Sequence, residues 1–261
     1  MKNKFLNHIK LLCTALLLIT SFYSCSQKSD IAPVYAEIPD ANFKAYLKTI
    51  VPLAFTADGK FISNHPSVVT YDEIMSIRRK NITSLSGIEY FTSLKVLDCI
   101  DNNIATLDLS KNKALTNLNC SYNKFTNLDV SKYTSLTKLD CGNNKLKTLN
   151  LSKNVNLTEL LCHGNLITSI NLGNNEVLTS VYCPNNQLVV LDVRNNKGLI
   201  ELNCKNNLLS TVIIVDPNNK LARLYLDDSV KCNHPGIKAF KDNGGELYGT
   251  FSEVIPSFEC K

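Results

Sequence analysis

The sequence predicts an α/β-type repeat solenoid: a right-handed coil of 21-residue repeats, mostly strand and coil, with a parallel sheet on its concave face and a small helical N-terminal cap. Three observations predict it. Six cysteines recur every 21 residues, a leucine opens each repeat, and an asparagine follows each of these cysteines by three residues. Such a period indicates that each repeat is one strand plus its return path, which buries its apolar face only when a neighbour stacks against it.

The apolar positions set the register of the repeats. Each opening leucine is followed three residues later by a second apolar residue and five residues later by the cysteine. The three positions are Leu94, Leu115, Leu136, Leu157, Leu178 and Leu199; then Leu97, Leu118, Leu139, Leu160, Val181 and Leu202; then Cys99, Cys120, Cys141, Cys162, Cys183 and Cys204. Residues two apart in an extended chain point the same way, so the second position and the cysteine face inward while their neighbours face outward. This pattern, LxxLxCxxNxLxxLxL, is that of a leucine-rich repeat, and we expect such repeats over residues 94–226.

The asparagines are expected to form a ladder inside the stack. They are Asn102, Asn123, Asn144, Asn165, Asn186 and Asn207. Each lies where the chain bends out of its strand and leaves backbone groups unpaired, which a buried amide satisfies. The segments LDLSKN, LDVSKY and LNLSKN, which end at Asn112, Tyr133 and Asn154, place turn residues on the far side of the coil, where a full helix has no room. Stacked at about 4.8 Å, roughly seven strands are expected in the sheet.

The ten cysteines separate into the ladder and four others. The ladder thiols occupy an inward apolar position that Leu226 takes in the degenerate repeat LARLYL, so we interpret them as small hydrophobic residues rather than metal ligands. Cys232 and Cys260, 28 residues apart, are expected to form a disulfide that fastens the C-terminal cap. The alternative is a zinc site of Cys232, His234 and Cys260, which lacks an obvious fourth ligand.

The first residues have the pattern of an export signal. Residues 1–24 carry three lysines and then an apolar run too short to span a bilayer, and SFYSC resembles a lipobox, so we expect a lipoprotein signal peptide with lipidation at Cys25 and a polar tether over residues 25–36. The alternative is ordinary secretion with cleavage nearby. Without the three leader lysines, 25 of the 28 basic residues remain against 23 acidic ones, which gives no electrostatic reason to expect nucleic-acid binding.

Atypical segments are expected to cover both ends of the solenoid. Residues 37–93 are expected to form a helical N-terminal cap and an incomplete first coil. In the cap, Asp40 is expected to begin a helix with Phe43 and Leu47 on one face, and Thr70 to begin a second helix as part of a capping box. Between them, FTADGKFISN resembles a calcium loop but keeps only one carboxylate, Asp58, so we interpret it as a turn with no metal. Residues 227–261 are expected to form the C-terminal cap, with a short helix at PGIKAF.

Three segments together resemble a known family. IPDANFKAYL, NITSLSGIEYFTSL and the tandem LTxLxCxxNxLxxLDLSKN units are similar to leucine-rich repeat lipoproteins of the Bacteroidetes, related in architecture to internalins. The resemblance covers nearly all of the chain after the leader. It implies an outer-membrane lipoprotein on the cell surface or the periplasmic face, held to the membrane only by its lipid. The tripeptide around Ser229 also resembles the O-glycosylation sequon of these bacteria.

The outward strand positions are the surface on which we expect function. Solenoids bind partners on such faces. The candidate ligand-binding residues are Asn119, Lys138, Asp140, Glu159, Leu161, His163, Tyr182, Glu201, Asn203, Arg223 and Tyr225. Tyr182 and Tyr225, with Leu161 and His163, are the expected centre of the interface, since aromatic anchors dominate protein interfaces. The alternatives are scattered surface apolar residues, a glycan-binding module, which the absence of Trp disfavours, and a structural spacer without a ligand.

The sequence predicts no enzyme. No nucleophile is paired with a base, and His65, His163 and His234 lie on three separate segments. Asp98 and Asp140 are two repeats apart, roughly 10 Å by strand spacing, too open for a glycosidase pair. The predicted function is that of a monomeric, non-enzymatic cell-envelope lipoprotein without cofactor or nucleic acid, which binds a protein or a surface polymer.

Overall fold

The computed structural model describes residues 31–209, 211–213, 220–227 and 244–248. Residues 1–34 and 35–261 form two separate units, and the first has neither helix nor strand in its described residues, 31–34. Several predictions therefore lie outside the described residues: lipidation of Cys25, glycosylation of Ser229, the Cys232–Cys260 disulfide and its zinc alternative with His234, and the helix at 235–240. No helix in the described ranges has the length and apolar character needed to cross a membrane.

The N-terminal cap is a small helical unit, as predicted. Helix α2 (Ala41–Ile50) begins at Asp40, whose Oδ1 accepts hydrogen bonds from the backbone N–H groups of Asn42 (3.0 Å) and Phe43 (2.9 Å). The helix buries Phe43 and Leu47. Around it lie the antiparallel strands β1 (Tyr35–Ala36) and β2 (Phe61–Ile62), the short helix α3 (Pro66–Val69), and the 3-10 turns η1 (Pro52–Ala54) and η2 (Ile88–Tyr90).

The prediction that Thr70 begins a helix is wrong. Thr70 ends α3, and its hydroxyl donates to the Pro66 carbonyl at 2.8 Å. The helix begins earlier because His65 caps it through Nδ1, which accepts from the Ser67 N–H at 3.2 Å, and Pro66 favours the first helical position. After Thr70 the chain is extended and pairs with the first repeat.

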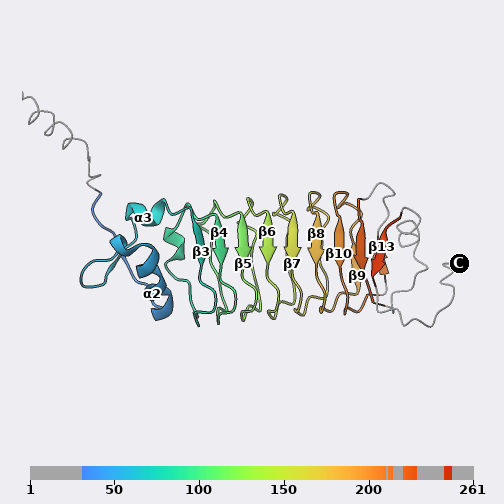
Figure 1. Cartoon of the computed structure of the whole chain (residues 1–261), viewed down its shortest axis with the longest axis horizontal. Helices are drawn as coiled ribbons and strands as arrows, with labels where there is room; N and C mark the ends of the chain where they lie inside the picture. The colour runs from blue at the N-terminus through green and yellow to red at the C-terminus, as the bar shows by residue number, and fades with distance from the viewer. Residues whose placement is uncertain (1–30, 210, 214–219, 228–243, 249–261) are drawn as a thin grey trace, which may run out of the picture. The chain divides into compact units, whose positions relative to one another are not determined.

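Within the described residues, the repeats form one parallel sheet of nine strands, which confirms the predicted solenoid (Figure 1). Its strands, in order, are β3 (Ile74–Ser76), β4 (Val96–Asp98), β5 (Asn117–Asn119), β6 (Lys138–Asp140), β7 (Glu159–Leu161), β8 (Ser180–Tyr182), β10 (Glu201–Asn203), β12 (Arg223–Tyr225) and β13 (Glu246–Tyr248). The number exceeds the expected seven because β3 precedes the first cysteine repeat and β13 follows the last. On the far side, β9 (Val190–Asp192) and β11 (Thr211–Ile213) form a second parallel pair.

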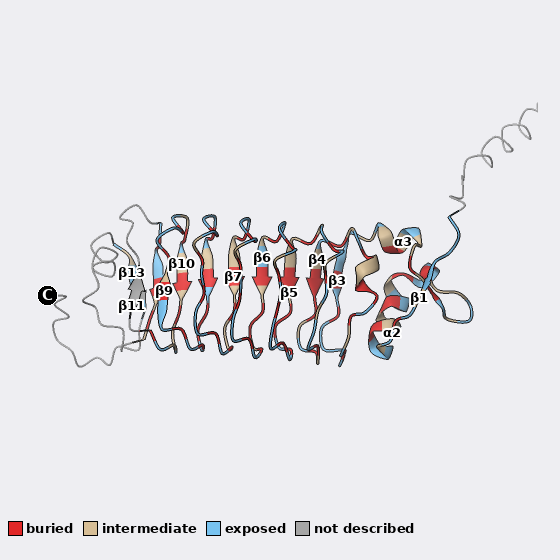
Figure 2. Ribbon diagram, turned by 180° about the vertical axis from the view of Figure 1, so that it is seen from behind, coloured by how far each residue is buried: buried red, intermediate tan, exposed pale blue. Residues whose placement is uncertain are grey.

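The predicted asparagine ladder is present inside the stack. Asn144 is typical: its Nδ2 donates to the carbonyls of Cys120, Cys141 and Gly142 at 3.0 to 3.1 Å, and its Oδ1 accepts from the Phe125 N–H at 3.1 Å. One side chain therefore joins two successive coils. In Figure 2 the middle position of the repeat strands is buried, and buried positions alternate with exposed ones along the return paths. The buried residues form a continuous apolar interior.

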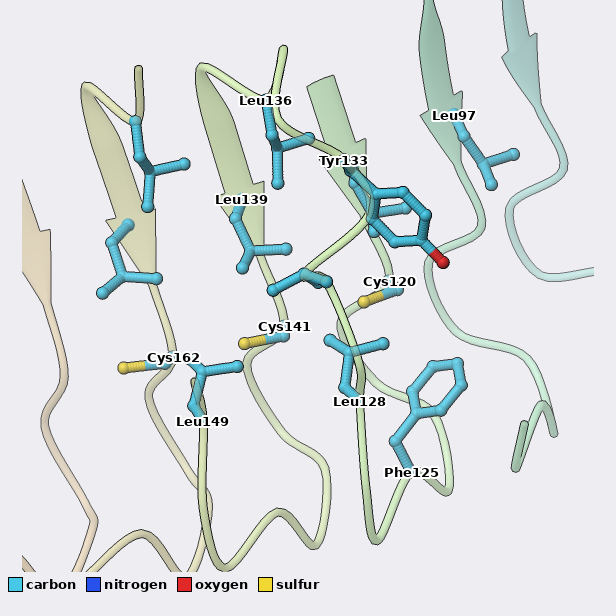
Figure 3. Close-up of a cluster of buried hydrophobic side chains, with 14 of the residues drawn as sticks. Leu97, Cys120, Phe125, Leu128, Tyr133, Leu136, Leu139, Cys141, Leu149 and Cys162 are labelled. Atoms are coloured by element: carbon cyan, nitrogen blue, oxygen red, sulfur yellow. The ribbon is translucent and has the colours of Figure 1, made fainter. Parts of the chain in front are cut away.

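A second ladder lies at the far-side turns, and its burial was not predicted. Asn112, Asn154, Asn175 and Asn196 are fully buried. Each donates through Nδ2 to two backbone carbonyls, at least one of them in the preceding coil; for Asn112 these are Ile88 and Phe91, both at 2.9 Å. Tyr133 takes the equivalent place between Asn112 and Asn154, and its hydroxyl accepts from the Leu109 N–H at 3.0 Å (Figure 3).

Candidate binding surface on the sheet

Strand pairing aligns the outward side chains into two columns. The central column is formed by the last residue of each strand: Ser76, Asp98, Asn119, Asp140, Leu161, Tyr182, Asn203, Tyr225 and Tyr248. The flanking column is formed by the first residue: Ile74, Val96, Asn117, Lys138, Glu159, Ser180, Glu201, Arg223 and Glu246. All candidate ligand-binding residues lie in these columns except His163, which directly follows Cys162 beside them.

A shallow depression of about 290 Å³ lies over β4 to β7. Its lining combines apolar groups, such as Val96 and Leu161, with Asp98, Asp140 and other polar side chains of both columns. Two ion pairs cross the sheet here: Lys138 Nζ lies 3.0 Å from Glu159 Oε2, and the Arg78 guanidinium binds the Asp98 carboxylate. This half of the face is therefore polar, and most of its charge is internally compensated.

Asp140 is the exception among these carboxylates. It is half-buried and has no ion pair within the described residues. Burial raises the pKa of its carboxyl group, and the effect is only partly offset by the Gly142 N–H, which donates to Oδ1 at 3.0 Å, and by the neighbouring side chains of His163, Asn119 and Ser121. Asp140 is therefore a partly desolvated carboxylate with neutral groups around its oxygens.

Aromatic side chains gather on the C-terminal half of the central column. Tyr182 packs edge-on against His163 with ring centroids 5.3 Å apart. Tyr225 and Tyr248 stack with centroids 4.6 Å apart and ring planes 16° apart. Beside them Arg223 Nη2 lies 2.7 Å from Glu201 Oε2, and the Tyr248 hydroxyl donates to Glu246. The structure thus brings Tyr182, His163 and Tyr225 onto one surface, as expected.

Sequence reasoning missed Tyr248. It lies within the segment assigned to the C-terminal cap, where no leucine opens a repeat of the usual spacing. The signal was the tripeptide ELY at 246–248, which repeats RLY at 223–225 and pairs with it residue by residue. The central column therefore ends in two adjacent tyrosines.

The position of His163 depends on a glycine in the preceding coil. A Cβ atom at Gly142 would lie 2.2 Å from His163 Cε1, so the ring occupies the space that a side chain there would fill. His163 Nε2 lies 2.9 Å from Asn143 Nδ2, while Nδ1 is buried without a hydrogen-bond partner in the described part of the chain. Gly142 thus allows His163 to lean across one coil toward Asp140.

The groups near Asp140 do not form an accessible catalytic arrangement. Ser121 is 1% exposed, and its hydroxyl donates to Asn119 Oδ1 at 2.8 Å. Within the ranges the structure describes, no three His, Cys, Asp or Glu side chains are grouped as metal ligands. In the predicted turn of the cap, Asp58 pairs with Lys60 at 3.0 Å and binds the Thr56 hydroxyl, so its carboxylate is already engaged.

The cysteine ladder is interior, as expected. All six thiols are free and buried, and Cys120, Cys141 and Cys162 form a row behind the strands (Figure 3). Burial raises the pKa of each thiol. They are therefore neutral packing groups and contribute nothing to the outer face.

No family model and no curated protein matches this sequence, but solved structures do. The functional domain of InlJ from Listeria monocytogenes, described as including a cysteine ladder, is 30% identical over 77% of this chain and 53% of that chain, with a TM-score of 0.46. Internalin C2 from Listeria monocytogenes is 19% identical over 72% of this chain and 93% of that chain, with a TM-score of 0.54. The leucine-rich repeat domain of APL1B is 21% identical over 60% of this chain and 52% of that chain, with a TM-score of 0.51.

The chain has the leucine-rich repeat fold. Internalin C2 and the APL1B domain carry this conclusion together with the 21-residue period and the parallel sheet. The chain spans about half the length of the InlJ domain it matches. Membership in the Bacteroidetes lipoprotein group stays a prediction from the sequence.

Proposed function

We propose that this solenoid is a non-enzymatic binding module that captures a protein partner on the face of its nine-stranded sheet. The observation that carries the proposal is the aromatic part of the central column. Tyr182 and Tyr248 are 39% and 40% exposed, although polar residues would serve solubility better at these positions. Tyrosines combine a large apolar surface with a polar tip and recur as anchors of protein interfaces.

A protein partner fits this surface better than a glycan. Tyr225 and Tyr248 use one ring face against each other, and Tyr182 is packed against His163, so few flat ring faces are open to a sugar. The ion pair of Arg223 with Glu201 borders the rings and supplies the polar rim that protein interfaces have. The chain also has no Trp, the residue with the largest ring for stacking on a sugar.

Selection from a phage-displayed random-peptide library tests the proposal. The wild-type chain and the variant Tyr182→Ala with Tyr225→Ala are used as separate baits. We expect peptide families that are enriched on the wild type and lost on the variant. Tyr35→Ala removes an exposed tyrosine of β1 in the cap and is the matched control, expected to retain every family. Peptides that bind wild type and double variant equally, with both folded by circular dichroism, would refute the assignment of this face.

We further propose that Cys25 carries a lipid and that the chain is an outer-membrane lipoprotein. The support is the sequence SFYSC, which ends at Cys25 and directly follows the apolar run of residues 11–20. Expressed with its leader, the wild type should enter the detergent phase on Triton X-114 partition, and Cys25→Ser should stay in the aqueous phase. Equal partition of the two proteins would exclude this anchor. Protease treatment of intact cells, with a periplasmic leakage control, then separates surface from periplasmic exposure.

A further inference from the structure

We infer that the depression over β4 to β7 is a subsite for one basic side chain, an arginine or lysine of the captured protein, with Asp140 as its counter-ion. This inference rests on the proposed function and specifies the chemistry of the partner. The tyrosines supply apolar contact at the other half of the face, and the depression supplies a charged contact two to five strands away.

The charged residues of the face leave one carboxylate in the depression without an ion pair. Arg78 is paired with Asp98, Lys138 with Glu159, and Arg223 with Glu201. Among the described residues Asp140 has no such cation. An incoming positive charge therefore finds an unpaired carboxylate here, whereas an incoming negative charge finds its potential cationic partners already engaged.

The surroundings of Asp140 hold its carboxylate ready for a cation. The Gly142 N–H donates to Oδ1 at 3.0 Å, and the side chains of Asn119 and Ser121 in the preceding coil lie close to the carboxylate. The backbone N–H and both of these side chains are neutral, so they surround the carboxylate without neutralising it. Because burial already disfavours the charged form, pairing with a cation should stabilise it more than at an exposed aspartate.

The walls of the depression suit the stem of a basic side chain. Val96 and Leu161 supply the apolar side chains of its lining, and its volume is about 290 Å³. Lysine and arginine bury their methylene groups against apolar surface while their charged ends reach a polar partner. The other charged groups that face the site are Asp98, Lys138 and Glu159, with His163 beside it; Lys138 is held by Glu159, which reduces its repulsion.

The test uses two short peptides that differ only in charge. N-acetyl-Gly-Arg-Gly-amide is titrated against the full chain and followed by backbone amide NMR, and N-acetyl-Gly-citrulline-Gly-amide is the neutral isostere. We expect saturable shifts at Asn119, Asp140 and Gly142 with the arginine peptide, weakening with added salt, and none with the citrulline peptide. Asp140→Asn should weaken binding about tenfold or more, as expected for removal of one partner of a charge pair.

The matched control is Asp129→Asn, the same substitution at an exposed turn on the return path of the coil. It should bind the arginine peptide as the wild type does. Equal binding of the citrulline peptide, or unchanged affinity in a folded Asp140→Asn variant, would overturn the subsite. The proposed function is judged separately: peptide families that still depend on Tyr182 and Tyr225 would keep the binding face even if the subsite fails.

Discussion

At the scale of single residues, the alternation of side chains along a strand predicted most but not all of what the structure shows. It predicted the outward positions of the repeat strands correctly, from Asp98 to Tyr225, because the direction of a side chain in an extended chain depends only on its position. It could not show that Ser121 is buried or that His163 leans over Gly142. Those features depend on the size of a side chain in the neighbouring coil, which no single repeat contains.

Asp140 gives a prediction about stability and pH. Burial raises its folded-state pKa above the usual 3.8, so between that value and the raised one the folded state holds its proton more tightly than the unfolded state does. Stability contributed by this group therefore falls as pH rises through that window. Asp140→Asn should melt higher than the wild type at pH 7, and the difference should disappear below pH 3.8. Thermal unfolding followed by circular dichroism across this range measures it.

Asp129 supplies the opposite case. Hydrogen bonds from Ser131 lower its pKa below 3.8, so its contribution to stability is present at neutral pH and is lost as pH falls. Asp129→Asn should therefore melt slightly lower than the wild type at pH 7. A lower melting temperature for Asp140→Asn than for wild type at that pH would contradict the account of its burial.

Elements with a local signal were predicted well, and elements that need a neighbour were not. Helix α2 was predictable because Asp40 caps it and Phe43 and Leu47 share one face. Strands β3 and β13 carry neither the cysteine nor the following asparagine, so the repeat pattern did not reveal them. They are strands because the sheet edges beside them offer unpaired backbone groups.

The two asparagine ladders should differ in their contribution to stability. Asn144 donates to three carbonyls and accepts one N–H, whereas Asn175 donates to two carbonyls and its Oδ1 has no partner in the described residues. Asn144→Leu leaves more buried backbone groups unsatisfied, and we expect it to cost about 3 kcal/mol or more, against about 2 kcal/mol for Asn175→Leu. Urea unfolding of both variants measures the two costs; an equal cost would show that the Oδ1 bond and the third carbonyl bond of Asn144 together add nothing to stability.

Two tyrosine hydroxyls close the outer edge of β3. The Tyr46 hydroxyl accepts from the Ser76 N–H at 3.2 Å, and the Tyr71 hydroxyl donates to the Ile74 carbonyl at 3.4 Å. Exposed strand edges promote pairing between chains, and these bonds occupy the edge. Tyr46→Phe with Tyr71→Phe keeps both rings but frees the edge, so the variant should self-associate more than the wild type in sedimentation velocity. Tyr35→Phe is the control, and a double variant that sediments as the wild type does would show that the hydroxyls do not protect the edge.

The solenoid as a whole behaves as a linear array in which each coil is supported only by its neighbours. Interior coils are packed on both sides, while the end coils depend on the helical cap at one end and the β12 and β13 coils at the other. The period predicted this architecture because it repeats six times. The side chains of the outer face vary from coil to coil, so the period predicts which surface is free to vary but not the chemistry of a partner.

Each cysteine of the ladder can report when its own coil unfolds, because unfolding exposes its thiol to alkylation. Alkylation requires an exposed thiolate, and burial both hides the six thiols and raises their pKa, so iodoacetamide should modify none of them in native buffer. As urea increases, Cys204 should react before Cys141, because fewer coils follow it in the sheet. Mass spectrometry of each cysteine peptide measures the order, and the fully unfolded chain is the control for intrinsic reactivity. Simultaneous modification of all six would mean that the stack unfolds as one cooperative unit, and modification of Cys141 first would contradict unfolding from the C-terminal end.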